Sequence, residues 1–275
     1  MKKTAFATAL AALFTANVQA DTVGLYLGGQ LWQSEASGIF GEENTLIDFN
    51  LKKEQQINYF VAVEHPFPLL PNVRISSTTL DTTGKTTLPQ EFSFGDETFP
   101  IGDDVNAYIN ASYVDYTLYY ELFDNGLFSF DFGLTARDFD GSVTVTGKTI
   151  IVITFEEEEH LGHPGHVDTV EISTPVTPTG KIKTDEIMPM LYVATNISLP
   201  LTGLSVFAQG DFLLIDDHTL YDYQVGLSYG LVDSRMVDFN VTLGYRVVEM
   251  EFEDLDNLYT DLEFKGAFVG VIAHF

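Results

Sequence analysis

The chain is 275 residues long and carries 40 acidic against 13 basic residues, for a formal net charge of −27, and it contains no cysteine. This acidity argues against nucleic-acid binding, which depends on clustered lysine and arginine. The missing cysteines exclude disulfides and thiolate metal sites and suit an oxidising compartment. The length allows one barrel of moderate size or one soluble domain.

The N-terminal segment has the features of a secretory signal peptide. Two lysines precede an apolar run from Ala5 to Phe14, and Ala20 ends a short stretch of the small residues that a signal peptidase requires. We therefore expect cleavage near Ala20 and export of the chain. Residues 1–20 would be the signal peptide, and residues 21–275 would form a single domain.

Segments with a two-residue period recur along the rest of the chain. The clearest is a hairpin whose strands span residues 111–123 and 128–137 and whose turn is Asp124-Asn125-Gly126. One face of each strand is apolar and aromatic and the other is polar, which suits a wall between lipid and a polar interior. Similar patterns predict the remaining strands at residues 23–35, 56–64, 72–82, 184–199, 204–214, 219–230, 235–253 and 259–275.

A membrane-spanning helix is the alternative for residues 187–210, because this stretch contains no charged side chain. Pro189, Pro200 and Gly203 argue against a continuous helix. A turn from Pro200 to Gly203 would divide the stretch into two strands, and we prefer that interpretation.

The predicted connections differ in length in a regular way. Short links at residues 66–71, 124–126, 200–203 and 231–234 alternate with long ones at 36–55, 83–110 and 138–183. This asymmetry is typical of bacterial barrels, whose periplasmic turns are short and whose extracellular loops are long. The sequence thus predicts an all-β fold, a closed antiparallel transmembrane barrel of about ten strands, within a range of about eight to twelve. Closure is expected because lipid leaves no partner for an open strand edge.

The last strand carries the most specific resemblance. Val269, Val271, Ala273 and the terminal Phe275 share one face of it. Together with the signal peptide, the aromatic strands and the stretch Leu243-Gly244-Tyr245-Arg246, it resembles the small outer-membrane β-barrel proteins of Gram-negative bacteria, similar in architecture to the OmpA transmembrane domain, OmpW and OmpX. The resemblance implies an outer-membrane location and insertion by the outer-membrane assembly machinery, which reads such a last strand. The resemblance implies no activity. We also expect the chain to contact outer-membrane lipid and lipopolysaccharide and to be a monomer.

Ionisable residues fall on the strand faces that point into the predicted barrel. By alternation these are Asp115, Glu121, Asp131, Arg137, Asp211, Asp222, Asp238 and Arg246. In a small barrel such groups usually pair with one another and fill the interior, which is the interpretation that we favour. The alternative is a cation path, since acids outnumber arginines among these residues and an acidic lumen favours cations.

The segment from Glu156 to Asp168 is the candidate metal site. His160, His163 and His166 are spaced by three beside Glu159, and imidazole with carboxylate suits zinc, copper or nickel. A solvated acidic loop is the plainer interpretation. Acid pairs in other predicted loops could hold calcium or magnesium and bridge to lipopolysaccharide phosphates. We expect no cofactor beyond such divalent cations.

An enzyme is not expected. Asp216-Asp217-His218 has the spacing of the Asp and His pair of the omptin proteases, but no second acidic pair accompanies it. The sequence favours a non-enzymatic, porin-like barrel that passes small solutes or stabilises the envelope. The alternative is a surface binding module that captures metal or a partner with the acidic, histidine-bearing loop at residues 141–183.

Overall fold

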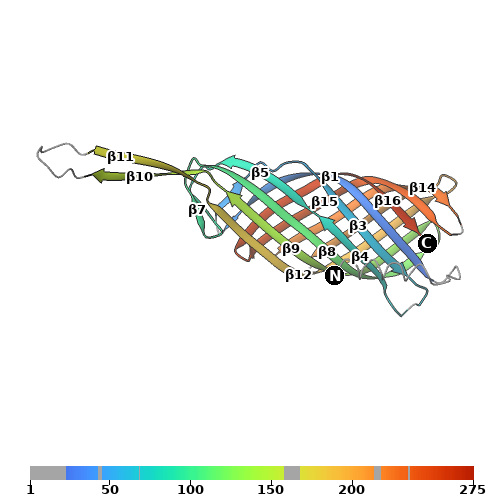
Figure 1. Cartoon of the computed structure of the whole chain (residues 1–275). Coiled ribbons are helices and arrows are strands. Elements are labelled where there is room, and N and C mark those ends of the chain that lie inside the picture. The colour runs from blue at the N-terminus through green and yellow to red at the C-terminus, as the bar shows by residue number, and fades with distance from the viewer. Residues whose placement is uncertain (1–22, 43–44, 68, 158–167, 214–217, 235) are drawn as a thin grey trace, which may run out of the picture.

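Ten strands close into an antiparallel barrel in the computed structural model, which describes residues 23–42, 45–67, 69–157, 168–213, 218–234 and 236–275 (Figure 1). No helix in these ranges is long and apolar enough to cross a membrane. The barrel strands are β1 (Gly24–Glu42), β3 (Glu54–Glu64), β4 (Asn72–Thr79), β8 (Asp104–Asp124), β9 (Phe128–Thr146), β12 (Thr179–Leu199), β13 (Leu204–Leu213), β14 (His218–Asp233), β15 (Asp238–Leu255) and β16 (Leu258–His274).

The first and last strands close the sheet. β1 pairs with β16 from Tyr26 opposite His274 to Gly41 opposite Tyr259. The other barrel strands follow one another around the sheet in chain order. Short turns join β3 to β4, β8 to β9, β12 to β13 and β14 to β15 at one end. The prediction of a closed ten-stranded antiparallel barrel with short turns at one end is therefore confirmed.

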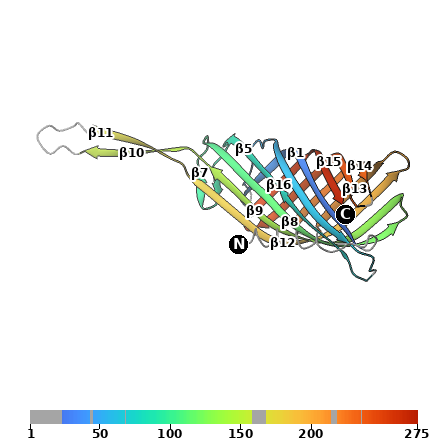
Figure 2. The ribbon, with the colours of Figure 1, turned by 45° about the vertical axis from the view of Figure 1, so that its right-hand side comes forward.

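The opposite end, which the short-turn rule assigns to the cell exterior and which we call the extracellular end, contains more regular structure than the sequence analysis predicts. Two strands extend the wall, because β2 pairs with β1 and β5 pairs with β8. The β10–β11 hairpin projects beyond the barrel in both views (Figures 1 and 2). The segments 36–55, 83–110 and 138–183, expected to be loops, thus hold much of their length in strands. The additional strands are β2 (Thr45–Asp48), β5 (Asp81–Thr87), β6 (Phe92–Phe94), β7 (Glu97–Phe99), β10 (Thr149–Glu157) and β11 (Asp168–Val176).

A reversal of polarity along each long strand explains this difference. In the turn-side half of β8, Leu118 faces outward and Asp115 faces the interior. In the other half, Ile109 faces the interior and Asn106 faces outward. The first arrangement suits lipid outside, and the second suits water outside. A search for apolar residues on the outward face therefore cut β1, β8, β9 and β12 short, whereas β15 and β16 were predicted over nearly their full length.

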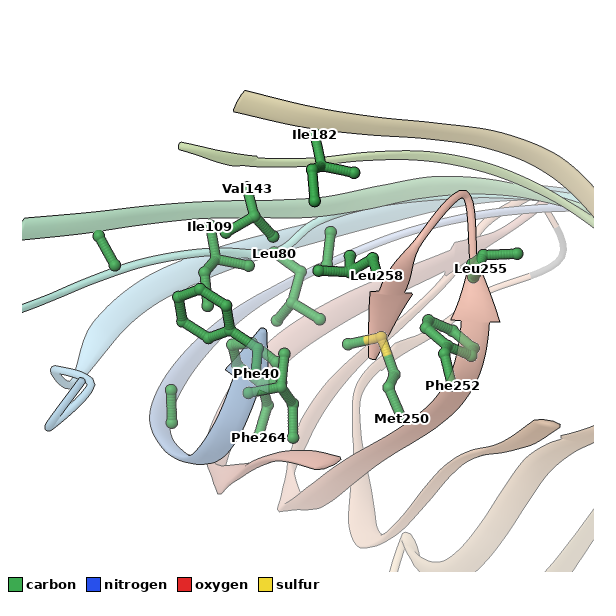
Figure 3. Close-up of a cluster of buried hydrophobic side chains, with 14 of the residues drawn as sticks. Phe40, Leu80, Ile109, Val143, Ile182, Met250, Phe252, Leu255, Leu258 and Phe264 are labelled. Atoms are coloured by element: carbon green, nitrogen blue, oxygen red, sulfur yellow. The ribbon is translucent and has the colours of Figure 1, made fainter. Parts of the chain in front are cut away.

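The extracellular half of the barrel is filled by an apolar core. Side chains from opposite walls point toward one another in its interior (Figure 3). The β6–β7 hairpin adds aromatic rings, and the backbone N–H of Gly95 in its turn donates to Glu42 Oε1 of β1 over 2.7 Å. Each fully buried ring of this kind contributes about 1.5–3 kcal/mol through its removal from water. The rings with no measurable exposure are those of Phe40, Phe49, Phe92, Phe94, Phe99 and Phe264.

Candidate functional site in the barrel interior

Arg137 links opposite walls of the barrel just below the apolar core. Its Nε and Nη2 atoms donate to the two carboxylate oxygens of Asp115 on the neighbouring strand β8, over 2.7 and 2.9 Å. Nη2 also donates to Asp222 Oδ2 on β14 over 2.8 Å. Because β9 and β14 are not neighbours in the sheet, this second contact crosses the lumen.

Asp222 is the centre of the network. Arg246 of β15 donates to both of its oxygens, from Nε over 2.9 Å and from Nη2 over 2.8 Å. The hydroxyl of Tyr113 donates to Oδ2 over 2.6 Å, and the Tyr113 ring lies 3.6 Å from the Arg137 guanidinium carbon. Burying such charges costs several kcal/mol per ion, which only close pairing and further hydrogen bonds offset. The network has both for every group except Arg137 Nη1, which is buried without a hydrogen-bond partner in the described part of the chain, and it forms a partition across the interior.

Local register brings these side chains together. The two-residue period places Tyr113 and Asp115 on the same inward face of β8, and Asp115 lies directly opposite Arg137 on β9. On the other wall, Gln224 lies opposite Arg246, which places Asp222 diagonally across from Arg246. Diagonal neighbours in an antiparallel pair are within reach of a long side chain such as arginine.

A small polar cavity adjoins the network. Its lining side chains are Asn58, Arg74, Ser76, Asp115, Gln209, Asp211, Asp222, Gln224 and Arg246. Asp211 accepts a hydrogen bond from Thr135 Oγ1 over 2.6 Å, and Gln30 Nε2 donates to Gln224 Oε1 over 3.1 Å. The interior thus remains polar on the turn side of the partition.

The predicted lumen residues separate into two groups. Five of them are buried at the level of the network and its cavity, namely Asp115, Arg137, Asp211, Asp222 and Arg246. The other three lie toward the turn end. Glu121 is exposed and lies opposite Asp131 across the β8–β9 pair, while Asp238 is half-buried with its Oδ2 atom 3.6 Å from His274 Nδ1.

Sequence reasoning missed Tyr113 and Trp32, whose side chains complete the partition. Tyr113 shares the inward parity of Asp115, and this parity is the signal that would have identified it. The Trp32 ring lies 5.3 Å from the Arg246 guanidinium carbon, and its Nε1 donates to the Gly266 carbonyl over 3.2 Å. No pattern in β1 alone indicates that Trp32 contacts Gly266, because β1 and β16 meet only when the barrel closes.

The candidate metal ligands His160, His163, His166 and Glu159 lie outside the described residues. So do Asp216 and Asp217 of the omptin-like spacing. Within the described ranges, no group of three or more histidine, aspartate or glutamate side chains is placed to hold a metal ion.

The proposed assembly signal lies on the outward face of β16. Val269, Val271 and Phe275 are exposed there, and Ala273 is half-buried on the same face. This face belongs to a belt of outward-facing apolar side chains that encircles the turn-side half of the barrel. Each barrel strand contributes to the belt, with exposed members at Leu31, Ile57, Val73, Leu118, Leu134, Ile197, Val206, Val225, Leu243 and Val269.

A closed sheet inside an apolar belt defines a transmembrane β-barrel, because it leaves neither an unpaired edge nor a polar side chain facing lipid. The architecture is that of the Gram-negative outer-membrane barrels. No family model and no curated protein sequence matches the chain.

Solved structures similar to the chain come from several such barrels. The attachment invasion locus protein Ail of Yersinia pestis is 11% identical, with coverage of 92% of this chain and 99% of that one and a TM-score of 0.28. The toluene transporter TodX of Pseudomonas putida is 8% identical, with coverage of 95% and 93% and a TM-score of 0.30. The translocator domain of the autotransporter NalP of Neisseria meningitidis is 10% identical, with coverage of 98% and 96% and a TM-score of 0.31. The assignment to a class rests on the closed sheet and belt of this chain itself.

Proposed function

We propose that the protein is a closed, non-enzymatic barrel of the outer membrane that stabilises the envelope and presents its extracellular half as a binding module. The observation that supports this proposal is the cross-lumen network of Asp115, Arg137, Asp222 and Arg246 beneath an apolar core. The barrel inserts as a monomer with help from the outer-membrane assembly machinery. Its belt contacts lipid, and its extracellular half stands beside lipopolysaccharide.

Two barriers in series oppose passage of a solute. A solute would first have to displace the apolar side chains of the extracellular half, and then separate Arg137 from Asp222 across the lumen. Breaking a buried ion pair by removing one partner typically costs about 3–5 kcal/mol. A barrel closed in this way is suited to anchoring and display. The strands that continue past the belt, together with the β10–β11 hairpin, supply the displayed surface.

Single-channel recording tests the closed barrel. The mature chain would be refolded, inserted into planar bilayers and held under a salt gradient, with folding checked by the heat-dependent shift in gel mobility. A folded barrel should give no steady conductance. A persistent open state in the wild-type chain would contradict the proposal.

Passage of small cations is the second candidate, and it has an observation in its favour. Glu64, Glu121 and Asp131 lie at the turn-side mouth, and the Tyr119 hydroxyl donates to Glu64 Oε1 over 2.8 Å. An acidic mouth leading to a polar cavity suits cations. The same recording distinguishes the two candidates, since a steady current that reverses near the cation equilibrium potential would support this one.

Metal capture is a separate form of the binding proposal and depends on His160, His163 and His166. Zinc titration of the full chain, compared with a variant in which all three histidines are alanine, tests it. Loss of one binding event in the variant would support capture. Equal binding by both chains would overturn it.

A further inference from the structure

The link between β3 and β4, from His65 to Pro71, exposes large apolar side chains at the turn end of the barrel. Phe67, Leu69 and Leu70 are 62, 88 and 58% exposed, and position 68 lies outside the described residues. The link contains three prolines and no aspartate, glutamate, lysine or arginine. Apolar side chains that are exposed together mark a surface that contacts a partner or a membrane.

The backbone of the link is paired with groups of its own segment. The His65 ring accepts from the Phe67 N–H at Nδ1 over 3.2 Å and donates from Nε2 to the Pro71 carbonyl over 3.1 Å. Both bonds form only when the proton is on Nε2 alone, so the ring is uncharged. The Leu70 N–H donates to the Phe67 carbonyl over 3.2 Å. The His65 N–H donates to Asn72 Oδ1 over 3.0 Å.

This pairing suits an environment without water. Prolines have no N–H, so only four residues of the link carry a backbone donor, and His65, Phe67 and Leu70 are three of the four. In lipid, a backbone polar group must find its partner within the protein. The link thus combines apolar side chains with a backbone that is largely satisfied internally.

A hydrogen bond ties the link to the outer side of the barrel wall. The Tyr120 hydroxyl donates to the Leu69 carbonyl oxygen over 3.3 Å. Tyr120 shares the outward face of β8 with Leu118, a member of the belt. In both views the connection between β3 and β4 projects sideways from the turn end of the barrel (Figures 1 and 2). A segment that leaves a lipid-facing wall sideways meets the membrane.

The belt itself continues up to the link. Val63 on β3 lies directly opposite Val73 on β4, and these two form the last outward-facing pair before the link. Val61 and Ile75 form the next such pair. The β8–β9 turn differs, because its Asp124 side chain accepts a hydrogen bond from a turn N–H, as suits water. The exposed surface of the link is therefore continuous with the lipid-facing belt.

We propose that the β3–β4 link is embedded in the turn-side leaflet of the membrane, with Phe67, Leu69 and Leu70 among the acyl chains of the lipid. Removal of these side chains from water favours insertion, and the uncharged link has no ionised group to desolvate. The link extends the belt sideways and fixes the depth of the barrel at this end. The proposal rests on the transmembrane span of the belt and is independent of whether the lumen conducts.

Tryptophan quenching tests the depth of the link, because the native chain has one tryptophan, Trp32, which is buried in the interior. Leu69→Trp adds a reporter in the link. Leu118→Trp and Thr202→Trp add references in the belt and in the β12–β13 turn. Each mature chain is refolded into phospholipid vesicles, and the wild-type emission is subtracted. Lipids brominated at known acyl positions quench rings in lipid, and acrylamide quenches rings in water.

The added ring of Leu69→Trp should be quenched by brominated lipid, as that of Leu118→Trp is, and protected from acrylamide relative to that of Thr202→Trp. Its depth should be about 5–10 Å inside the boundary between headgroups and acyl chains, as for other interfacial segments. Acrylamide quenching equal to that of Thr202→Trp, with little quenching by brominated lipid, would overturn the proposal. Quenching of Leu118→Trp by brominated lipid in the same experiment would show that the belt still spans the membrane.

A matched pair of variants tests whether the apolar side chains hold the link in lipid. In the Leu69→Trp chain, Phe67→Asn together with Leu70→Asn should raise acrylamide quenching, because the link would move into water. Leu201→Asn is the control, since Leu201 is also fully exposed but lies in the β12–β13 turn, and it should leave the quenching unchanged. Equal quenching with and without the two asparagines in the link would contradict anchoring by these side chains.

Discussion

Asp222 is the residue on which the interior network most depends, because two arginines and a tyrosine hydroxyl donate to it. Asp222→Asn removes the charge and leaves Arg137 and Arg246 facing each other without it. We expect a loss of about 3–5 kcal/mol in the free energy of unfolding, the usual cost of breaking a buried pair. Urea unfolding in lipid vesicles, followed by tryptophan fluorescence, measures the loss.

Asp238→Asn is the control for this prediction. Asp238 faces His274 at the rim, where both side chains are more than a third exposed. An exposed pair is worth about 0–1 kcal/mol, so the control should unfold nearly as the wild type does. Equal stability of both variants would mean that the network closes the lumen without stabilising the fold.

Gly95 and Gly102 form a second matched pair at the residue scale. Both have a positive φ, of 56° and 81°, so alanine is strained at either position. A Cβ on Gly95 would lie 2.3 Å from the Lys181 backbone nitrogen, whereas one on Gly102 meets no atom within 4 Å. Gly95→Ala should therefore cost about 1–3 kcal/mol more than Gly102→Ala, as overpacking does. Thermal unfolding of the two variants gives the difference, and equal midpoints would contradict the close packing of the β6–β7 hairpin on β12.

At the scale of the element, β8 shows what the sequence could reveal and what it could not. For its turn-side half, the sequence predicted both the residue range and which side chains face outward, because Leu118 and Asp115 alternate as a lipid-facing strand requires. Its extracellular half was assigned to a loop, although Ile109 and Asn106 alternate just as regularly in the opposite sense. The sequence does not show at which residue β8 leaves the membrane, and this position decides which face of the strand must be apolar.

The interior contacts were predictable only in part, for a related reason. Alternation along one strand identifies Arg137 and Asp222 as inward-facing. Their contact depends on how far the ten strands shift relative to one another around the barrel, and this is a property of closure that no single strand encodes. The apolar packing of β8, β9 and β12 against β15 and β16 was missed for the same reason, since these strands are far apart in the sequence.

The position of the belt on β8 predicts how a charge at two sites on this strand changes the stability of the barrel. Leu118 and Asn106 are exposed on the same outward face, the first within the belt and the second beyond it. Leu118→Lys should cost about 2–4 kcal/mol, as a charge near the bilayer midplane does. Asn106→Lys should change stability by less than about 0.5 kcal/mol, as surface substitutions do. Equilibrium unfolding from vesicles measures both, and similar costs would place the membrane boundary further toward the extracellular end.

For the whole molecule, the short turns at one end of the barrel predict one orientation across the membrane, and the absence of native cysteine makes it simple to test. Single cysteines would replace Asn106 beyond the belt, Leu118 within it and Thr202 in the β12–β13 turn. A membrane-impermeant maleimide added to intact cells should label only the cysteine at position 106. After the outer membrane is permeabilised the cysteine at position 202 should react as well, while lipid keeps position 118 protected. Labelling of position 202 in intact cells would show that the barrel has the opposite orientation, with the β10–β11 hairpin on the periplasmic side.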